Sequence, residues 1–485
     1  MKKGDLLELE ITGYAFEGKG ISKIIKEIHS QDDPAPKKFV IFVQGSYPGD
    51  RVIARITKVR SSYAEAKIRD LIVKSDLRTE PECKYFGICG GCKTQDLQYE
   101  HQAGFKENQV RELFERIGGF TGFELLSIIR AEKTFFYRSK MEFSFSDKRW
   151  LTIDEISSMQ EVPDRNFALG LHIPGMFDKV LDIDGCWLQS DLSNGILNFT
   201  KEFFIHRQIP AHSIKEHTGM LRNLVIKQSF STGDLMANLV ILEESERLFT
   251  EYKESLLEKF PQVTTIVLNI NKKLSQVAYG DYEIVLHGPG YIHDMIGNYR
   301  FRVSANSFFQ TNAAQAEKLY STTLNFAGFK GTETVYDLYS GAGTIPIFIS
   351  ANVKQIFGFE SVDSAIEDAK KNIELNDISN FTPLLADLNK SLFPILNLRN
   401  LPAPDVIIAD PPRSGMNPKT VKDILDLSPE KIIYISCNPA TQARDIKILC
   451  DSAYRLIKVQ PVDMFPHTHH IENVVLLSKF RTRNN

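Results

Sequence analysis

The sequence of 485 residues contains no apolar run close to the roughly 20 residues that a membrane-spanning helix needs. Its first residues, MKKGDLLELE, bring acidic side chains where a secretory signal would have an apolar core. Only 6 residues are cysteine, too few for a disulfide-held scaffold. These absences predict a cytoplasmic protein with no membrane partner.

An excess of positive charge is also missing, since 58 Lys and Arg residues face 61 Asp and Glu residues, a formal net charge of −3. This balance excludes a uniformly basic nucleic-acid-binding protein, so a polyanion must be bound by a local patch. Residues 51–74 form such a patch, because seven basic residues there oppose only Glu65 and Asp70. The patch suits contacts with phosphates. A solvated protein face is an equally good interpretation of this segment taken alone.

Length and residue pattern predict three domains. Residues 1–75 consist of short alternating apolar and polar runs with turn signals, typical of a small β-barrel of the oligonucleotide-binding type. Residues 76–300 mix strands, loops and an expected helix at 96–117, which we expect to pack on the C-terminal domain. Four apolar residues share one face of that helix: Val110, Leu113, Phe114 and Ile117.

Residues 301–485 alternate apolar strands with helix-like stretches, the pattern of a parallel, doubly wound α/β sheet of the Rossmann type. The strand TVYDLYS leads into a turn with Gly341 and Gly343, and Glu360 ends the next strand. The turn lacks the third glycine of a dinucleotide-binding loop. This favours a nucleoside ligand without phosphates, of which S-adenosylmethionine is the common one. Asp387, near the end of a third strand, is predicted to reach an adenine amine.

Two further strand ends carry reactive groups. Asp410 begins the run DPPR after one strand, and Cys437 lies in SCNP after the next. Strand ends in such a sheet face the ligand crevice, so Cys437 is a candidate nucleophile, whereas Cys450 is interpreted as a buried structural thiol. Glu472 is the candidate base. His467, His469 and His470 form a weaker metal-site alternative, because no fourth ligand is evident.

A thiol in this position suits chemistry at carbon 5 of uracil, which is a poor nucleophile. Addition of a thiolate to carbon 6 turns the ring into an enolate, and carbon 5 then attacks an electrophilic methyl group. A base must remove the proton at carbon 5 before the thiolate leaves. Covalent catalysis thereby splits one difficult step into easier ones.

These motifs, together with the cluster CKYFGICGGC at residues 83–92, Cys186 in DGCW and the stretch FFQTN at 308–312, resemble the bacterial RNA uracil-C5 methyltransferases. The resemblance spans nearly the whole chain and is strongest to the iron–sulfur members that modify 23S ribosomal RNA. It identifies residues 1–75 as a TRAM domain, 76–300 as a central α+β domain with the cluster, and 301–485 as the methyltransferase domain. The helix at 96–117 falls within the second of these.

The resemblance also implies residue roles. Cys437 would be the nucleophile and Glu472 the general base, with Asp410 beside them. The S-adenosylmethionine contacts would be Gln310, Tyr339, Gly341, Glu360, Asp387 and Asp410. The ligands of a [4Fe–4S] cluster would be Cys83, Cys89, Cys92 and Cys186, although four thiolates equally suit zinc when judged by spacing alone.

The resulting prediction is a monomeric enzyme of rRNA processing that forms 5-methyluridine in 23S rRNA. The same reaction on the T-loop uridine of tRNA is the alternative within the class. A non-catalytic, metal-stabilised RNA-binding protein is the alternative from another class. Cytosine methylation is disfavoured, because Arg413 rather than cysteine follows Pro412.

Overall fold

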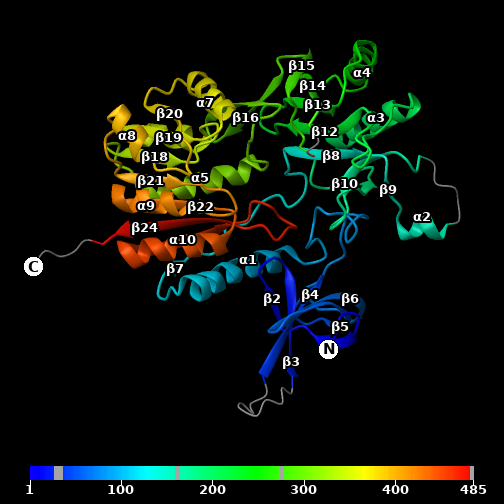
Figure 1. The fold of residues 1–485 in the computed structure, drawn as a ribbon, viewed down its shortest axis with the longest axis horizontal. Coiled ribbons are helices and arrows are strands. Elements are labelled where there is room, and N and C mark those ends of the chain that lie inside the picture. Colours follow the sequence, from blue (N-terminus) through cyan, green and yellow to red (C-terminus); the bar gives the residue numbers. More distant parts are fainter. Residues whose placement is uncertain (27–36, 159–163, 274–276, 481–485) are drawn as a thin grey trace, which may run out of the picture.

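The computed structural model describes residues 1–26, 37–158, 164–273 and 277–480, and it contains three large sheets and one hairpin (Figure 1). The N-terminal sheet, blue in the figure, has the strand order β1-β5-β6-β4-β3-β2. Its strands are β1 (Leu6–Glu10), β2 (Gly13–Ala15), β3 (Lys19–Lys26), β4 (Lys37–Gln44), β5 (Arg51–Val59) and β6 (Tyr63–Val73). Alternate residues of β5, such as Val52, Ala54 and Ile56, enter a small apolar core. The expected all-β segment is thus present.

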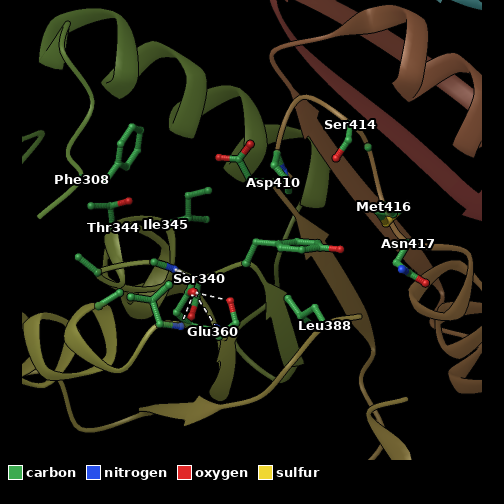
Figure 2. A pocket seen from close by; sticks show the side chains of 18 of the residues that line it. Phe308, Ser340, Thr344, Ile345, Glu360, Leu388, Asp410, Ser414, Met416 and Asn417 are labelled. Carbon is green, nitrogen blue, oxygen red and sulfur yellow. Dashed lines mark hydrogen bonds between the residues drawn. The ribbon is translucent and has the colours of Figure 1, made fainter. Parts of the chain in front are cut away.

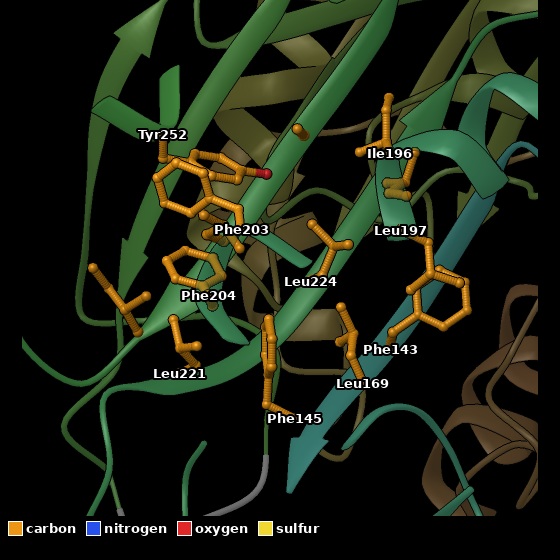
Figure 3. Packing of buried hydrophobic residues seen from close by; sticks show 14 of the residues in the cluster. Phe143, Phe145, Leu169, Ile196, Leu197, Phe203, Phe204, Leu221, Leu224 and Tyr252 are labelled. Atoms are coloured by element: carbon orange, nitrogen blue, oxygen red, sulfur yellow. The ribbon is translucent and has the colours of Figure 1, made fainter. Parts of the chain in front are cut away.

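The central sheet has the order β15-β14-β13-β12-β8-β10-β11-β9. Its strands are β8 (Lys140–Ser146), β9 (Arg149–Trp150), β10 (Ala168–His172), β11 (Val180–Asp182), β12 (Leu221–Gln228), β13 (Leu235–Ile241), β14 (Thr265–Ile270) and β15 (Tyr282–His287). The accompanying helices are α2 (Ile153–Ser157), α3 (Asp191–His206) and α4 (Glu246–Lys259). Aromatic side chains of α3 and α4, including Phe203, Phe204 and Tyr252, pack on one face of the sheet (Figure 3).

The C-terminal sheet has the order β20-β19-β18-β21-β22-β24-β23-β7. Its strands are β7 (Glu124–Leu125), β18 (Thr334–Leu338), β19 (Gln355–Glu360), β20 (Phe381–Leu385), β21 (Val406–Ala409), β22 (Lys431–Ser436), β23 (Tyr454–Val462) and β24 (Glu472–Lys479). Strands β18 to β22 run parallel, and β24 is antiparallel to both β22 and β23. This is the expected doubly wound α/β arrangement, with one antiparallel strand, β24, inserted between β22 and β23.

Helices cover both faces of the C-terminal sheet because successive residues of its buried strands point to opposite sides. Val335 of β18 packs with α5 (Ala313–Ala327), α6 (Thr344–Ile349) and α7 (Asp363–Leu375). Tyr336, the next residue, packs with α8 (Phe393–Arg399), α9 (Pro418–Leu427) and α10 (Pro439–Ser452). A short 3₁₀ turn, η2 (Ser350–Asn352), follows α6. The hairpin of β16 (Tyr291–Ile296) and β17 (Tyr299–Ser304) joins the first of these cores.

Part of the early chain belongs to this late sheet. Helix α1 (Tyr99–Leu113) continues into a π-helical turn, η1 (Phe114–Gly118), and β7 then pairs in parallel with β23. Val110 and Phe114 are fully buried in the same core as Tyr336. Ile117, expected on the same face, is 42% exposed instead, because a π turn rotates the following residues relative to an α-helix.

Within the described residues, no helix is both long and apolar enough to cross a bilayer.

Candidate active site

A cavity of about 970 Å³ opens where β18, β19 and β21 end (Figure 2). Five of the residues predicted to bind a nucleoside cofactor line it, namely Gln310, Tyr339, Gly341, Glu360 and Asp410. Tyr339 and Gly341 follow β18, Glu360 ends β19, Asp410 follows β21, and Gln310 lies between β17 and α5. Because parallel strands place their carboxyl ends at the same sheet edge, residues more than 70 positions apart in sequence converge on one crevice.

The wall of the cavity after β18 is a tight turn. Tyr339 has a φ of +70° and Gly343 a φ of +80°, both in the left-handed region. A Cβ on Gly343 would lie 2.8 Å from the Phe381 ring, so only glycine allows α6 to approach the sheet this closely. At Gly341 the space beside Cα is open, and its backbone amide is held 3.0 Å from Oε2 of Glu360.

Glu360 is fixed by several backbone donors. Its Oε2 accepts from the amide of Gly341, and its Oε1 accepts from the amides of Ser361 at 2.7 Å and Val362 at 2.9 Å. The carboxylate therefore stays at the cavity wall without a bound ligand. A carboxylate at the end of the second strand is suited to accept hydrogen bonds from ribose hydroxyls.

Two buried carboxyl groups lie beneath this wall. Asp337, within β18, is fully buried, and neither of its carboxyl oxygens has a hydrogen-bond partner among the described residues. Burial, together with the charges of Asp410 and Glu360, raises the pKa of Asp337 well above its usual value. Burial raises the pKa of Asp410 to about 7. The unsatisfied carboxyl of Asp337 and the raised pKa of Asp410, which lines the cavity, fit a ligand that brings hydrogen-bond donors or positive charge. The sequence reading did not select Asp337, although an acid inside an apolar strand is an available signal.

Asp387 is placed differently from the other predicted contacts. Strand β20 ends at Leu385, and the carboxylate of Asp387 turns to the amide of Asn389 at 3.0 Å and to Lys390 at 3.2 Å. It does not line the cavity, whereas the following Leu388 and Asn389 do. The side chain caps its own turn, which satisfies it locally.

Cys437 and Glu472 are brought together by strand register. Ser436, the last residue of β22, pairs with Asn473 of β24, so that Cys437 lies opposite Glu472 across the antiparallel pair. Neither residue lines the cavity itself, but Asp410 belongs to both groups. Glu472 is 8% exposed. The sheet therefore places a thiol and a buried carboxyl side by side next to the cavity.

The charges around this pair act on each other. Burial, reinforced by Glu472 and Asp410, raises the pKa of Cys437 to about 12, while Arg413 acts to lower it. Burial and Asp410 raise the pKa of Glu472 well above its usual value, and Arg413 again opposes the shift. Arg413 is thus the cation that favours both the thiolate and the carboxylate. Its Nη2 lies 3.5 Å from Nδ1 of His470.

The four predicted cluster cysteines line a second cavity of about 430 Å³. All four are free thiols: Cys83, Cys89, Cys92 and Cys186. Burial and the neighbouring sulfurs raise the pKa of Cys92 to about 12 and that of Cys186 to about 11. The structure therefore brings Cys186 to the other three despite a separation of over 90 residues.

Two of these sulfurs already accept hydrogen bonds, Cys89 from the amide of Gly91 and Cys92 from Nε2 of Gln95, both at 3.3 Å. Donors of this kind stabilise negatively charged sulfur in clusters. Within the described ranges, no three His, Cys, Asp or Glu side chains are positioned as a complete metal-ligand set. The donor chemistry fits a thiolate-bound metal, but the geometry of the described residues does not form its ligand set.

The segment between β23 and β24 connects the two cavities. Lys106 of α1 donates to Oδ1 of Asp463 at 2.6 Å, and both side chains are buried. The carbonyl of His467 accepts from the amide of Lys93 at 2.7 Å, directly after the last clustered cysteine. His467 itself stacks on Phe135 at 4.3 Å, which is a packing role and not a metal site. This connecting loop (residues 463–471) ends at Glu472.

The basic patch on β5 and β6 is partly neutralised. Lys58 pairs with Glu65, and Arg69 pairs with Asp70. Arg55 and Lys67 face each other directly across the two strands, and neither has an ion pair with any described residue. Two cations facing each other across a sheet are unfavourable unless an anion binds.

Comparisons with known proteins agree with this geometry. Residues 291–480 match the model of the tRNA (uracil-5-)-methyltransferase family, and residues 2–68 match the TRAM domain. An uncharacterized RNA methyltransferase of Chlorobaculum tepidum is 41% identical over 480 residues, covering 99% of this chain and 97% of the relative. One of Bacteroides thetaiotaomicron is 43% identical over 467 residues, covering 96% and 99%.

A solved structure is similar along its whole length. It is the tRNA (uracil-54, C5)-methyltransferase of Pyrococcus abyssi in complex with S-adenosyl-L-homocysteine. The two chains are 27% identical with a TM-score of 0.72, covering 97% of this chain and 100% of the other. The chain therefore belongs to the S-adenosylmethionine-dependent RNA uracil-5-methyltransferase family and carries a TRAM domain.

Proposed function

We propose that this protein methylates carbon 5 of a uridine in 23S rRNA through a covalent adduct between Cys437 and carbon 6 of the base. The observation that carries the proposal is the register of β22 and β24, which sets Cys437 opposite the buried Glu472 at the edge of the cofactor-sized cavity. A nucleophile and a proton acceptor on neighbouring strands are what this reaction requires.

The first cavity supplies the cofactor site. Glu360 would bind the ribose, Gly341 would let the backbone approach the ligand, and Gln310, Tyr339 and Asp410 would orient the reactive end. Asp387 remains a proposed contact only if its turn rearranges, since its carboxylate is engaged with Asn389. When bound, S-adenosylmethionine supplies an electrophilic methyl group on a positively charged sulfur.

The chain's own residues then carry out the proton and covalent chemistry. The thiol proton of Cys437 passes to solvent before the sulfur bonds to carbon 6; burial, which raises the pKa of Cys437 to about 12, disfavours that thiolate, and Arg413 favours it. Carbon 5 of the resulting enolate takes the methyl group. The Glu472 carboxylate then accepts the carbon 5 proton, the ring double bond re-forms, and the Cys437 sulfur leaves. Arg413 favours the charged forms of both residues.

The target base has to leave its stack to reach Cys437, since ring faces are inaccessible in a duplex. The TRAM domain would hold the flanking RNA backbone, with Arg55 and Lys67 at phosphates. We further propose three domains at 1–75, 76–300 and 301–485, supported by the three separate sheets, and a cytoplasmic monomer.

The four-cysteine cavity supports a [4Fe–4S] cluster held by Cys83, Cys89, Cys92 and Cys186. Its sulfur hydrogen bonds and its place beside the connecting loop suit a structural group that orders loop-rich chain. The joint presence of the cysteines and the TRAM domain favours the ribosomal target. The likeness to a tRNA (uracil-54, C5)-methyltransferase favours the T-loop of tRNA as the second candidate.

Mapping of 5-methyluridine in total RNA from a deletion strain tests the target. Loss at a 23S rRNA position supports the proposal, and loss in tRNA alone replaces it with the second candidate. Complementation with Cys437→Ala should not restore the modification, whereas Cys450→Ala should restore it. Restoration by Cys437→Ala would support the non-catalytic alternative and overturn the nucleophile.

A further inference from the structure

Two exposed aromatic side chains lie beside the cysteine cavity. Phe136 is 37% exposed and Trp187 38%, and their ring centroids are 5.5 Å apart. The amide of Phe136 donates to the carbonyl of Trp187 at 2.9 Å, which fixes the two chain segments together. We call this pair the aromatic ledge.

The backbone at the ledge is strained. Phe136 has a φ of +54°, a rare conformation for a bulky residue. Its neighbours point inward, since Phe135 stacks on His467 and Tyr137 is buried with its hydroxyl on the carbonyl of Pro466. The unusual φ therefore turns one aromatic ring of three toward solvent. Strain of this kind is concentrated at ligand contacts.

Cations lie on the side of the ledge that faces the cysteine cavity, whereas the acids Glu82, Asp184 and Asp191 line the hollow that Phe136 and Trp187 share. Arg138 and His470 line the same cavity as Trp187, and Arg413 reaches His470. Neither Arg138, Arg413 nor Lys93 forms an ion pair with any described residue. Glu142 is the acidic side chain of that cavity wall, and it already faces Lys140 at 3.7 Å.

Arg413, His470 and Arg138 relate the ledge to the Cys437 thiol in steps. Cys437 feels the charge of Arg413, Arg413 contacts His470, and His470 shares a cavity wall with Arg138 and Trp187. Cations along a track with an exposed aromatic pair at its end are the arrangement that single-stranded nucleic acid recognises, because each base presents a π-face and each linkage a negative charge.

We propose that the aromatic ledge binds an unpaired base of the RNA strand that flanks the target uridine, with Arg138 at the adjoining phosphate. The identity of that target rests on the proposed function. Because of the ledge, binding of the RNA requires an unstacked base next to the target uridine, in addition to the flipped uridine itself. Stacking on a ring tolerates any base, so the ledge sets the shape of the RNA rather than its sequence.

Equilibrium binding of a fluorescent oligouridylate of about twelve nucleotides to the anaerobically purified full chain tests the ledge. Trp187→Ala should raise the Kd about tenfold, and Trp187→Phe should retain most of the affinity, because stacking requires only a ring. Arg138→Gln should lower the dependence of binding on salt by about one counterion. Phe480→Ala is the matched control, since Phe480 is 40% exposed in a cavity lined by residues from the far ends of the strands, and it should bind like the wild type.

Photocrosslinking uses the unmutated protein, so its result does not depend on whether a variant folds. An oligouridylate containing 4-thiouridine should crosslink to the peptides that carry Phe136 or Trp187. A Kd for Trp187→Ala within twofold of wild type, or crosslinks confined to other peptides, would overturn the ledge. Retained methyl transfer by Cys437→Ala would instead overturn the proposed function and leave the ledge result intact.

Discussion

At the residue scale, the proposed mechanism gives Cys437 and Glu472 two separate steps: Cys437 forms the adduct, and Glu472 removes the carbon 5 proton from it. Glu472→Gln keeps the shape of the site but cannot accept the carbon 5 proton. We therefore expect a methylated RNA–protein adduct to accumulate, visible on a denaturing gel and confirmed by mass spectrometry. Glu430→Gln, an exposed acid just before β22, should release product normally. Normal release by Glu472→Gln would remove it from the base role.

A second prediction at this scale concerns Asp410 and the dependence of the free energy of unfolding on pH. The pKa of Asp410 rises from 3.8 to about 7 on folding, so the folded protein retains a proton that the unfolded chain has released. The free energy of unfolding consequently falls as pH rises across that interval. Asp410→Asn removes this penalty, and we expect a higher Tm of the cofactor-free protein at about pH 8, on the order of 2 kcal/mol of added stability, with methyl transfer lost. An unchanged or lower Tm in a calorimetric scan would contradict it.

Sequence reasoning reached most single residues of the site because strand ends are visible as apolar runs followed by polar residues. The contact predicted for Asp387 stays a prediction, since its carboxylate bonds within its own turn, and such local bonds cannot be read from a pattern. Sequence reasoning did not select Asp337 or the aromatic ledge. The ledge depends on one unusual φ and on pairing between segments about 50 residues apart, and neither leaves a periodic signal.

At the element scale, the connecting loop depends on α1. Lys106→Met would break the buried ion pair with Asp463 by removing its cation, a change that typically costs about 3–5 kcal/mol, although the amide of Phe465 still donates to the carboxylate. We expect a large fall in the midpoint of urea unfolding. The double variant Lys106→Met with Asp463→Asn should recover part of the loss, since it removes both charges. Equal stability of Lys106→Met and wild type would show that the pair is not buried in solution.

The sequence predicted whether a segment is a helix or a strand better than it predicted where that helix or strand ends. The helix expected at 96–117 exists at Tyr99–Leu113, but the π turn that follows it exposes Ile117. A π turn contains one residue more than an α-helical turn, and the spacing of apolar residues does not predict it. The parallel pairing of β4 with β6 inside the otherwise antiparallel N-terminal sheet is likewise a consequence of tertiary packing.

At the scale of the whole molecule, the cysteine cavity is lined by segments near residue 90 and near residue 186 and by the connecting loop (residues 463–471). Anaerobic purification should give a brown protein with the visible absorption of an iron–sulfur cluster. Cys186→Ser should lose the colour and make the central region more sensitive to limited proteolysis, and Cys450→Ser should change neither. A colourless wild-type protein with bound zinc would contradict the iron–sulfur assignment.

The N-terminal all-β segment and the C-terminal α/β sheet followed from periodicity, because strands alternating with helices differ visibly from short consecutive strands, whereas the eight-stranded central sheet was not predicted. The packing of the sheets against one another did not follow from length and periodicity. The second face of the central sheet, with Met236 and Val267, packs into the core of the β16–β17 hairpin and the C-terminal sheet. Contacts between distant units depend on shape, which a single sequence does not display.

The pairing of β7 with β23 has a consequence for synthesis. Nε2 of Gln460 bonds to the carbonyl of Ser127 across 333 residues, and α1 buries Val110 against the same late sheet. On the ribosome, these early segments must wait for nearly the entire remaining chain before they find their partners. A nascent chain that stops short of β23 therefore lacks both the loop that ends at Glu472 and the surface that covers α1. The proposed nucleophile Cys437 would meet RNA only in a molecule whose translation is essentially finished.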